Sequence, residues 1–174
     1  MWHKPDITSE ALHFFRDNHD PEKHMFEWGS GHSTPFFASK FAKLISVEYN
    51  REWFQQTSLF LSEFDNVELL LVPPDRLTTD CEKFASLCPD FKNDSFRKYA
   101  SVIDGYEKFQ WISVDGRGRI GCMIYAQNHM EPNGFLMLDD AHRYGYASVI
   151  DSYDNDPHMK VVVEGNTRIW QFID

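Results

Sequence analysis

The stretch Phe26-Glu27-Trp28-Gly29-Ser30-Gly31-His32-Ser33-Thr34-Pro35 decides the fold, because a short apolar run passes directly into a glycine-rich turn. Gly29 permits a tight turn, and Gly31 lets the backbone come close to a bound ligand. Thr34 and Pro35 suit the cap and the first turn of a helix. The stretch therefore predicts a strand over 25–28, a glycine turn at its end and a helix over 34–42.

The next apolar run ends on an acidic residue. The segment 44–48 is predicted to be a strand, and Asn50 is placed to cap a helix over 51–64. Glu48 closes the strand and lies 19 residues after Gly29. A carboxylate at this position can accept two hydrogen bonds from a ribose diol. The structural alternative is a tight turn with a solvated Glu48.

The rest of the chain continues this alternation of apolar runs and helical segments. Further strands are predicted over 67–72, 111–114, 135–138, 160–164 and 167–172, the last two flanking a hairpin turn at Gly165-Asn166. Further helices are predicted over 8–18, 120–130 and 144–153 and around 96–103, with a turn at 132–134; the segment 75–95 receives no assignment. The pattern implies a mostly parallel sheet covered by helices on both faces, with its ligand beyond the carboxyl ends of the strands.

Composition narrows the class of function. The 174 residues carry 17 Lys and Arg against 27 Asp and Glu, a formal net charge of −10. This balance opposes duplex nucleic acid as a partner, because a duplex-binding module needs a cationic face. The sequence has no apolar stretch that could span a bilayer, no signal-peptide core and no paired cysteine spacing. We expect a cytoplasmic protein with one domain over 1–174, and neither nucleic acid nor membrane as partner.

Four successive segments resemble the motifs of class I S-adenosylmethionine-dependent methyltransferases. They are residues 26–31, residues 44–49, Val114-Asp115-Gly116-Arg117 and Leu138-Asp139-Asp140, and with the terminal hairpin the pattern covers most of the chain. The resemblance implies a Rossmann-like, doubly wound α/β fold with a mostly parallel seven-stranded sheet in the order 3-2-1-4-5-7-6. It also implies S-adenosyl-L-methionine as the cofactor. The resemblance places Glu27, Gly29, Gly31 and Glu48 around this cofactor, and from their positions we also expect Ser30, Ser33, Thr34, Tyr49 and Asp115 there.

Three carboxylates follow the fourth and fifth predicted strands. Neighbouring strand ends lie about 5 Å apart, so Asp115 can converge with Asp139 and Asp140. In one interpretation these three residues bind Mg²⁺, because hard cations prefer oxygen ligands and metal-dependent catechol-type O-methyltransferases carry a similar set. In another, Asp140 or His142 is a general base without a metal, which makes Asp115, Asp140 and His142 the candidate catalytic residues. Capping of the following helix by an aspartate is the structural alternative.

The function that the resemblance implies is methyl transfer to a small-molecule acceptor, at a hydroxyl oxygen. Arg117, Arg119 and Arg143 lie near the same strand ends and suit an anionic acceptor, with ion pairs to the nearby aspartates as the alternative. An N-terminal helical segment over 1–24 and the segment 75–95 are candidate lids. Two other functions stay open. One is binding of S-adenosylmethionine or S-adenosylhomocysteine without transfer, and the other is NAD-dependent redox chemistry, which Thr34 and the hairpin disfavour.

Overall fold

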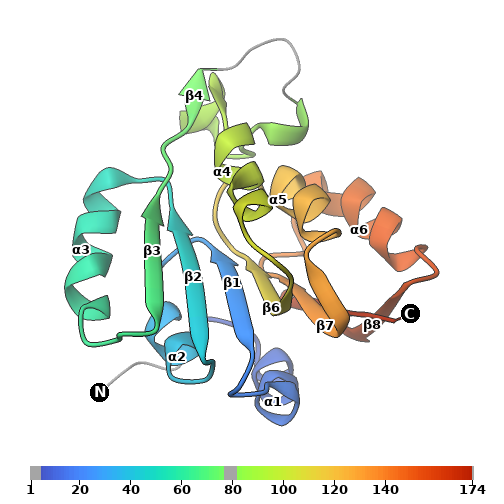
Figure 1. Ribbon diagram of the computed structural model, residues 1–174. Helices are drawn as coiled ribbons and strands as arrows, with labels where there is room; N and C mark the ends of the chain where they lie inside the picture. Colours follow the sequence, from blue (N-terminus) through green and yellow to red (C-terminus); the bar gives the residue numbers. More distant parts are fainter. Residues whose placement is uncertain (1–4, 77–81, 174) are drawn as a thin grey trace.

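The computed structural model describes residues 5–76 and 82–173, and its centre is a seven-stranded sheet (Figure 1). The strands are β1 (His24–Trp28), β2 (Lys43–Glu48), β3 (Val67–Leu71), β6 (Phe109–Val114), β7 (Met130–Leu138), β8 (Met159–Val163) and β9 (Arg168–Phe172). Their order is β3-β2-β1-β6-β7-β9-β8, with β9 antiparallel to both of its neighbours and the other pairs parallel. Numbered along the chain within this sheet, the order is the 3-2-1-4-5-7-6 that the sequence predicts, so the predicted fold class is confirmed.

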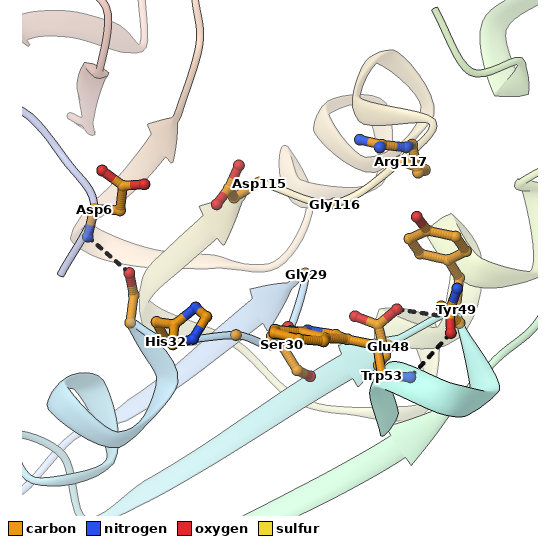
Figure 2. Close-up of a pocket in the computed structure, with 13 residues that line it drawn as sticks. Asp6, Gly29, Ser30, His32, Glu48, Tyr49, Trp53, Asp115, Gly116 and Arg117 are labelled. Carbon is orange, nitrogen blue, oxygen red and sulfur yellow. Dashed lines mark hydrogen bonds between the residues drawn. The ribbon is translucent and has the colours of Figure 1, made fainter. Parts of the chain in front are cut away.

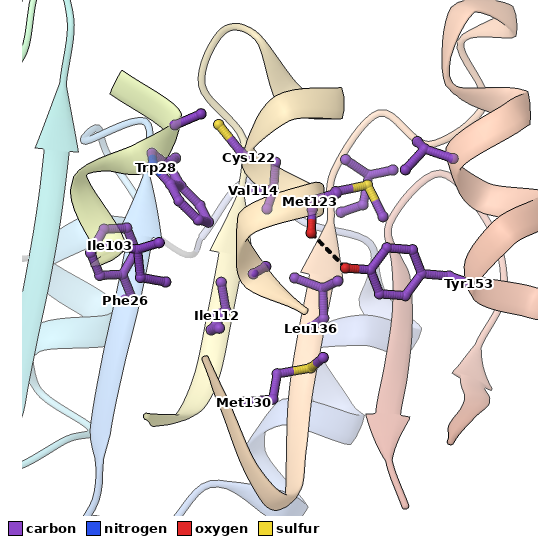
Figure 3. Close-up of a cluster of buried hydrophobic side chains, with 14 of the residues drawn as sticks. Phe26, Trp28, Ile103, Ile112, Val114, Cys122, Met123, Met130, Leu136 and Tyr153 are labelled. Carbon is purple, nitrogen blue, oxygen red and sulfur yellow. Dashed lines mark hydrogen bonds between the residues drawn. The ribbon is translucent and has the colours of Figure 1, made fainter. Parts of the chain in front are cut away.

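Helices cover both faces of the sheet. They are α1 (Ser9–Asn18), α2 (Thr34–Ala38), α3 (Arg51–Leu61), α4 (Arg97–Ser101), α5 (Arg119–Ala126) and α6 (Ala147–Asp154). On one face α4, α5 and α6 contribute to a core cluster with Phe26 and Ile112 (Figure 3). On the other face α1 and α2 pack with Met25 and Trp111. Adjacent strand residues thus serve opposite cores, as the two-residue period of a strand requires.

Side-chain caps explain where two helices begin. The Thr8 hydroxyl accepts a hydrogen bond from the Ala11 amide at the start of α1, and Asn50 Oδ1 accepts one from the Trp53 amide at the start of α3. These side chains satisfy amides that the first turn of a helix leaves free. Both caps are among the residues that the sequence marks as helix starts.

Three of the predicted helices are too long, and one of them, predicted over 51–64, ends at Leu61. The helix predicted over 34–42 ends at Ala38, and the helix predicted over 120–130 ends at Ala126. In the last case Met130 already pairs with Phe109 in the sheet, so the chain must leave the helix before it. Apolar residues continue beyond the end of each helix because the residues that follow pack into the core from loops or strands.

The turn predicted over 132–134 is wrong, because these residues belong to β7. The pairing of β6 with β7 shifts register across them, and Asn133 has a left-handed φ of 60°. A Cβ on Gly134 would lie 3.0 Å from the carbonyl oxygen of Gln110, so glycine permits the close approach of the two strands. The irregularity also accommodates Pro132, which cannot donate to a regular ladder.

The segment without a sequence assignment forms a small substructure above the carboxyl ends of the main strands (Figure 1). Its strands β4 (Asp75–Arg76) and β5 (Asp94–Ser95) pair antiparallel. Phe84 packs on α5, where a Cβ on Gly121 would lie 2.5 Å from the ring. Residues 77–81 of this segment and residues 1–4 of the predicted N-terminal lid lie outside the described residues. Among the helices of the described part, none combines the length and apolar composition needed to cross a membrane.

Candidate functional site

A cavity of about 540 Å³ opens at the carboxyl ends of β1, β2 and β6 (Figure 2). The loops after these strands supply most of its lining, and the end of β2, the first turn of α3 and the N-terminal segment supply the rest. Its walls are formed by Asp6, Gly29, Ser30, Gly31, His32, Ser33, Glu48, Tyr49, Asn50, Trp53, Asp115, Gly116 and Arg117. Gly31 and Glu48, which follow different strands, therefore line the same cavity.

The two glycines of the turn after β1 have different structural roles. Gly29 has a φ of 101°, and a Cβ on it would lie 2.6 Å from the Gly116 amide nitrogen. The turn after β1 therefore touches the loop after β6, and a side chain at Gly29 would separate them. No described atom lies within 4 Å of a Cβ built on Gly31, which lines the cavity. Gly31 thus leaves space for a ligand beside the backbone.

Glu27 and Thr34 lie beneath the glycine turn rather than in the cavity wall. Glu27 Oε2 accepts hydrogen bonds from the Thr34 hydroxyl at 2.8 Å and the Ser46 hydroxyl at 2.6 Å. Thr34 Oγ1 in turn accepts a hydrogen bond from the Gly31 amide at 2.8 Å. Burial raises the pKa of Glu27 to about 8, although both hydroxyl hydrogen bonds oppose the shift. These two residues, predicted as cofactor contacts, hold the turn in place from below.

Glu48 ends β2 with its carboxylate beside the cavity. Its Oε1 accepts a hydrogen bond from the Asn50 amide at 2.7 Å, and burial raises its pKa. From the first turn of α3, Trp53 Nε1 donates to the carbonyl oxygen of Ser30 at 2.7 Å. The cap of α3 therefore orients Glu48, and Trp53 ties the helix to the glycine turn.

Tyr49 and Arg117 face each other at one end of the cavity (Figure 2). The Tyr49 ring packs edge-on against Phe91 at 5.4 Å and Phe96 at 5.5 Å between centroids. The Arg117 guanidinium lies 5.8 Å from the centre of the Tyr49 ring, within the range of a cation–π contact. An aromatic surface and a cation therefore lie together next to Glu48.

The three predicted acidic residues converge, but an arginine lies among them. Carboxylate oxygens of Asp115, Asp139 and Asp140 all lie within 4.8 Å of one another. Arg119 Nη2 lies 2.7 Å from Asp115 and 3.3 Å from Asp140, and the Arg119 side chain is only 3% exposed. Asp139 accepts a hydrogen bond from the Thr167 hydroxyl at 2.7 Å. A Mg²⁺ ion would have to bind against this buried guanidinium, so the residues present do not fit the predicted metal.

Of the three predicted catalytic residues, Asp115 alone lines the cavity. Burial raises its pKa to about 7; Arg119 opposes this shift, and the carboxylates of Asp139 and Asp140 add to it. Asp140 pairs instead with Arg119 and with Arg143, whose Nη2 lies 2.5 Å away. His142 lies in a different surface hollow, beside Arg143. Arg119 therefore forms the ion pairs of the structural alternative, whereas Arg143 pairs with Asp140 and keeps part of its side chain exposed.

Several wall residues are not singled out as site residues by the sequence. These are Asp6, His32, Asn50, Trp53 and Gly116. His32 lies within the glycine turn and Asn50 lies two residues after Glu48. Their proximity in sequence to predicted site residues could have identified them as wall residues. Asp6 arrives from the N-terminal segment, where its amide donates to the Ser33 hydroxyl at 3.0 Å. No local pattern announces this contact between residues 27 positions apart.

The N-terminal segment is not a helical lid in the described residues. Ala11 and Phe15 of α1 are fully buried against the sheet, in the core cluster that contains Trp111. Asp6, which precedes α1, lines the cavity. The segment thus closes one side of the site with the residues before α1 and uses its helix for packing.

Comparisons with known proteins give matches in structure only. No protein-family model matches the chain, and no curated protein matches it either. A methyltransferase-like protein from Silicibacter pomeroyi aligns at a TM-score of 0.65 and 18% identity, over 98% of this chain and 88% of that one. An O-methyltransferase from Bacillus cereus in complex with S-adenosylhomocysteine aligns at 0.69 and 12% identity, over 99% and 84%. An rRNA methylase from Streptococcus thermophilus aligns at 0.65 and 14% identity, over 100% and 99%.

These similarities agree with the strand order of the sheet. The sheet has a parallel centre and a terminal antiparallel pair, and the cavity lies where parallel α/β sheets bind their ligands. At such low sequence identity a structural match establishes the fold and leaves the activity to be argued from the site. The chain therefore has the Rossmann-like fold of the class I S-adenosylmethionine-dependent methyltransferases.

Proposed function

We propose that the protein binds S-adenosylmethionine in the 540 Å³ cavity and transfers its methyl group to a hydroxyl oxygen of a small molecule. The observation that carries this proposal is the presence of Gly31 and Glu48 in one cavity, with Asp115 on the wall formed by the loop after β6. Gly31 leaves room beside the backbone, and Glu48 offers a carboxylate to a ribose diol.

The charges of the cavity suit this cofactor. The wall carries the carboxylates of Asp6, Glu48 and Asp115 against one guanidinium, that of Arg117. A sulfonium and an ammonium group are favoured next to such a surface, whereas a pyrophosphate is repelled by it. Tyr49 and Trp53 provide aromatic surface on the Glu48 side of the cavity, where an adenine ring can pack.

The chemistry needs few protein groups. Bound S-adenosylmethionine supplies an electrophilic methyl carbon attached to a cationic sulfur. An oxygen lone pair of the acceptor forms the new C–O bond while the electron pair of the C–S bond returns to sulfur. The hydroxyl proton passes to the carboxylate of Asp115, whose pKa of about 7 suits a base at neutral pH. Alignment of the two reacting atoms supplies the remaining acceleration.

The net charge of −10 supports a small acceptor. A polynucleotide would bring many phosphates to an acidic protein without the counterion release that usually drives such binding. The aligned rRNA methylase shows that this fold also occurs in a protein named for an RNA substrate. The acceptor class therefore rests on the charge of this chain and not on its fold.

Binding and turnover test the proposal in two steps. Calorimetry should show that S-adenosylmethionine and S-adenosylhomocysteine bind, with NAD much weaker than either. Tritium from methyl-labelled S-adenosylmethionine should then appear in the small-molecule fraction of a cell extract incubated with the protein. Binding without any labelled product would leave a cofactor-binding protein that does no methylation, and binding of NAD alone would contradict the proposal.

A further inference from the structure

A second cavity of about 310 Å³ adjoins the larger one and shares Gly116 and Arg117 with it. Its other walls come from the segment after β4, the loop before α5 and the loop after β7. They are formed by Ser86, Leu87, Cys88, Pro89, Gly118, Arg143 and Tyr146. The segment and the loop after β7 touch directly, since a Cβ on Gly145 would lie 2.6 Å from Leu87. Arg117 is therefore the side chain between the two cavities.

Arg117 differs from the neighbouring arginines in its partners. Arg119 and Arg143 each form ion pairs with carboxylates, whereas Arg117 has no ion pair with any described residue. Its Nε is buried and has no hydrogen-bond partner among the described residues. The guanidinium lies 5.8 Å from the Tyr49 ring and 5.9 Å from the Phe91 ring. Two aromatic rings hold the group in place, and its buried Nε–H is left free to donate to a ligand.

Arg143 brings a second cation to the same cavity. Its side chain is 44% exposed, and Asp140 occupies one of its nitrogens, so further N–H groups remain available. Tyr146 also lines the cavity, and burial raises its pKa, so its hydroxyl keeps its proton at neutral pH. Guanidinium groups recognise carboxylates and phosphates through paired N–H donors. The second cavity therefore offers donors and positive charge inside an otherwise acidic protein.

We propose that the second cavity binds a carboxylate or phosphate group of the methyl acceptor, with Arg117 and Arg143 as its ligands. This inference rests on the proposed methyltransferase function. The acceptor anion lies in the 310 Å³ cavity, and its hydroxyl reaches Asp115 across the shared wall at Gly116. A volume of this size lies at the lower end of the range for small-molecule sites. The acceptor is thus a small anionic hydroxy compound.

The test titrates inorganic phosphate, acetate and a short single-stranded RNA into the full-length protein saturated with S-adenosylhomocysteine. Arg117→Met and Arg143→Met remove the donors and keep apolar bulk. Lys40→Met is the control, because the Lys40 ammonium also lies over an aromatic ring, 5.7 Å from the centre of the Phe36 ring, but lines neither cavity. We expect phosphate or acetate to bind at least about tenfold more weakly to both site variants than to wild type and the control. The tighter of the two anions identifies the acceptor group.

The outcomes separate this inference from the proposed function. Arg143 lines the second cavity and not the larger one, so the affinity of Arg143→Met for S-adenosylhomocysteine should equal that of wild type. Failure of wild type to bind S-adenosylhomocysteine would contradict the proposed function. Equal anion binding by wild type and Arg117→Met, with S-adenosylhomocysteine bound, would overturn the anion site alone. Tighter binding of the RNA, lost in Arg117→Met, would overturn the small-molecule acceptor.

Discussion

Gly29 and Gly31 belong to one turn, yet a side chain should act differently at each position. Gly29→Ala puts a Cβ 2.6 Å from the Gly116 amide nitrogen at a φ of 101°, so we expect a loss of roughly 1–3 kcal/mol in unfolding free energy. Gly31→Val meets open space, so the stability should stay close to that of wild type. Its affinity for S-adenosylhomocysteine should fall by about tenfold or more, about 1.4 kcal/mol.

Urea unfolding and calorimetry measure these two effects. Gly105→Ala is a control for an added methyl group, since no described atom lies within 4 Å of a Cβ there and the position is outside the cavity. Unchanged ligand affinity in Gly31→Val would place the cofactor somewhere other than beside the glycine turn.

Glu27 should make the stability of the protein depend on pH. Its pKa is raised from 4.5 to about 8 on folding, so between these values the unfolded chain loses a proton that the folded protein keeps. Wild type should therefore lose stability as the pH rises through this window. Glu27→Gln cannot ionise, so it does not lose this stability. Within the window, the unfolding free energy of Glu27→Gln minus that of wild type should increase by roughly 1.4 kcal/mol for each unit that the pH rises.

Urea titrations at pH 5, 6, 7 and 8 check this difference, and Glu22→Gln, an exposed residue of the neighbouring turn, is the control. The comparison removes the contribution of Asp115, whose pKa is raised in both proteins. A difference between Glu27→Gln and wild type that stays constant with pH would mean that Glu27 is ionised in the folded state.

Asp115 should titrate near pH 7, and its neighbours should control the value. Asp140→Asn removes one repelling carboxylate and leaves Arg119 paired with Asp115 alone, so the pKa of Asp115 should fall. Carbon-13 NMR of the side-chain carboxyl groups follows this titration directly. Asp104→Asn, remote from the cluster and paired with His129, should leave the pKa of Asp115 unchanged. A wild-type value near the ordinary 3.8 would remove Asp115 as the base of the proposed transfer.

At the scale of elements, the packing of Phe84 on α5 should support the second cavity. Gly121→Val would bring its Cβ to 2.5 Å from the Phe84 ring, so the segment after β4 has to move away. We expect a loss of roughly 1–3 kcal/mol in unfolding free energy from overpacking. Phosphate or acetate binding should weaken while the affinity for S-adenosylhomocysteine is retained. Weakening of both ligands together would show that the two cavities do not respond independently.

The sequence predicts the sheet well because its signals are local. Apolar runs, a glycine turn and capping residues such as Asn50 are each read within a few positions. The segment 75–95 could not be assigned, because β4 and β5 are two residues long and, within the described ranges, pair only with each other. The bulge that contains Pro132 in β7 depends on pairing with the neighbouring strand. Its own sequence is typical of a turn, so the sequence alone could not predict a strand there.

The candidate site is predicted less completely, for a geometric reason. Arg117 and Arg119 flank Gly118, which has a left-handed φ of 59° at the start of α5. One arginine is directed to the boundary of the cavities and the other into the acidic cluster. Sequence spacing cannot distinguish these directions, and so it could not separate a cation pocket from an internal ion pair.

At the scale of the whole molecule, the distribution of charge argues for the choice of ligands. The protein has a net charge of −10, and the wall of its larger cavity contains three carboxylates. Both features favour a cationic cofactor. The boundary with the second cavity carries Arg117 without an ion-pair partner in the described residues, which favours an anionic acceptor. The two ligands would then meet with opposite charges beside Asp115.

A crystal structure of the protein grown with S-adenosylhomocysteine tests the central claim most directly. We predict that the ribose hydroxyls lie within hydrogen-bond distance of the Glu48 carboxylate and that the ligand backbone passes beside Gly31. The sulfur atom should then face Asp115. Ligand density at any other position, or a 540 Å³ cavity left empty at saturating ligand, would contradict the assignment.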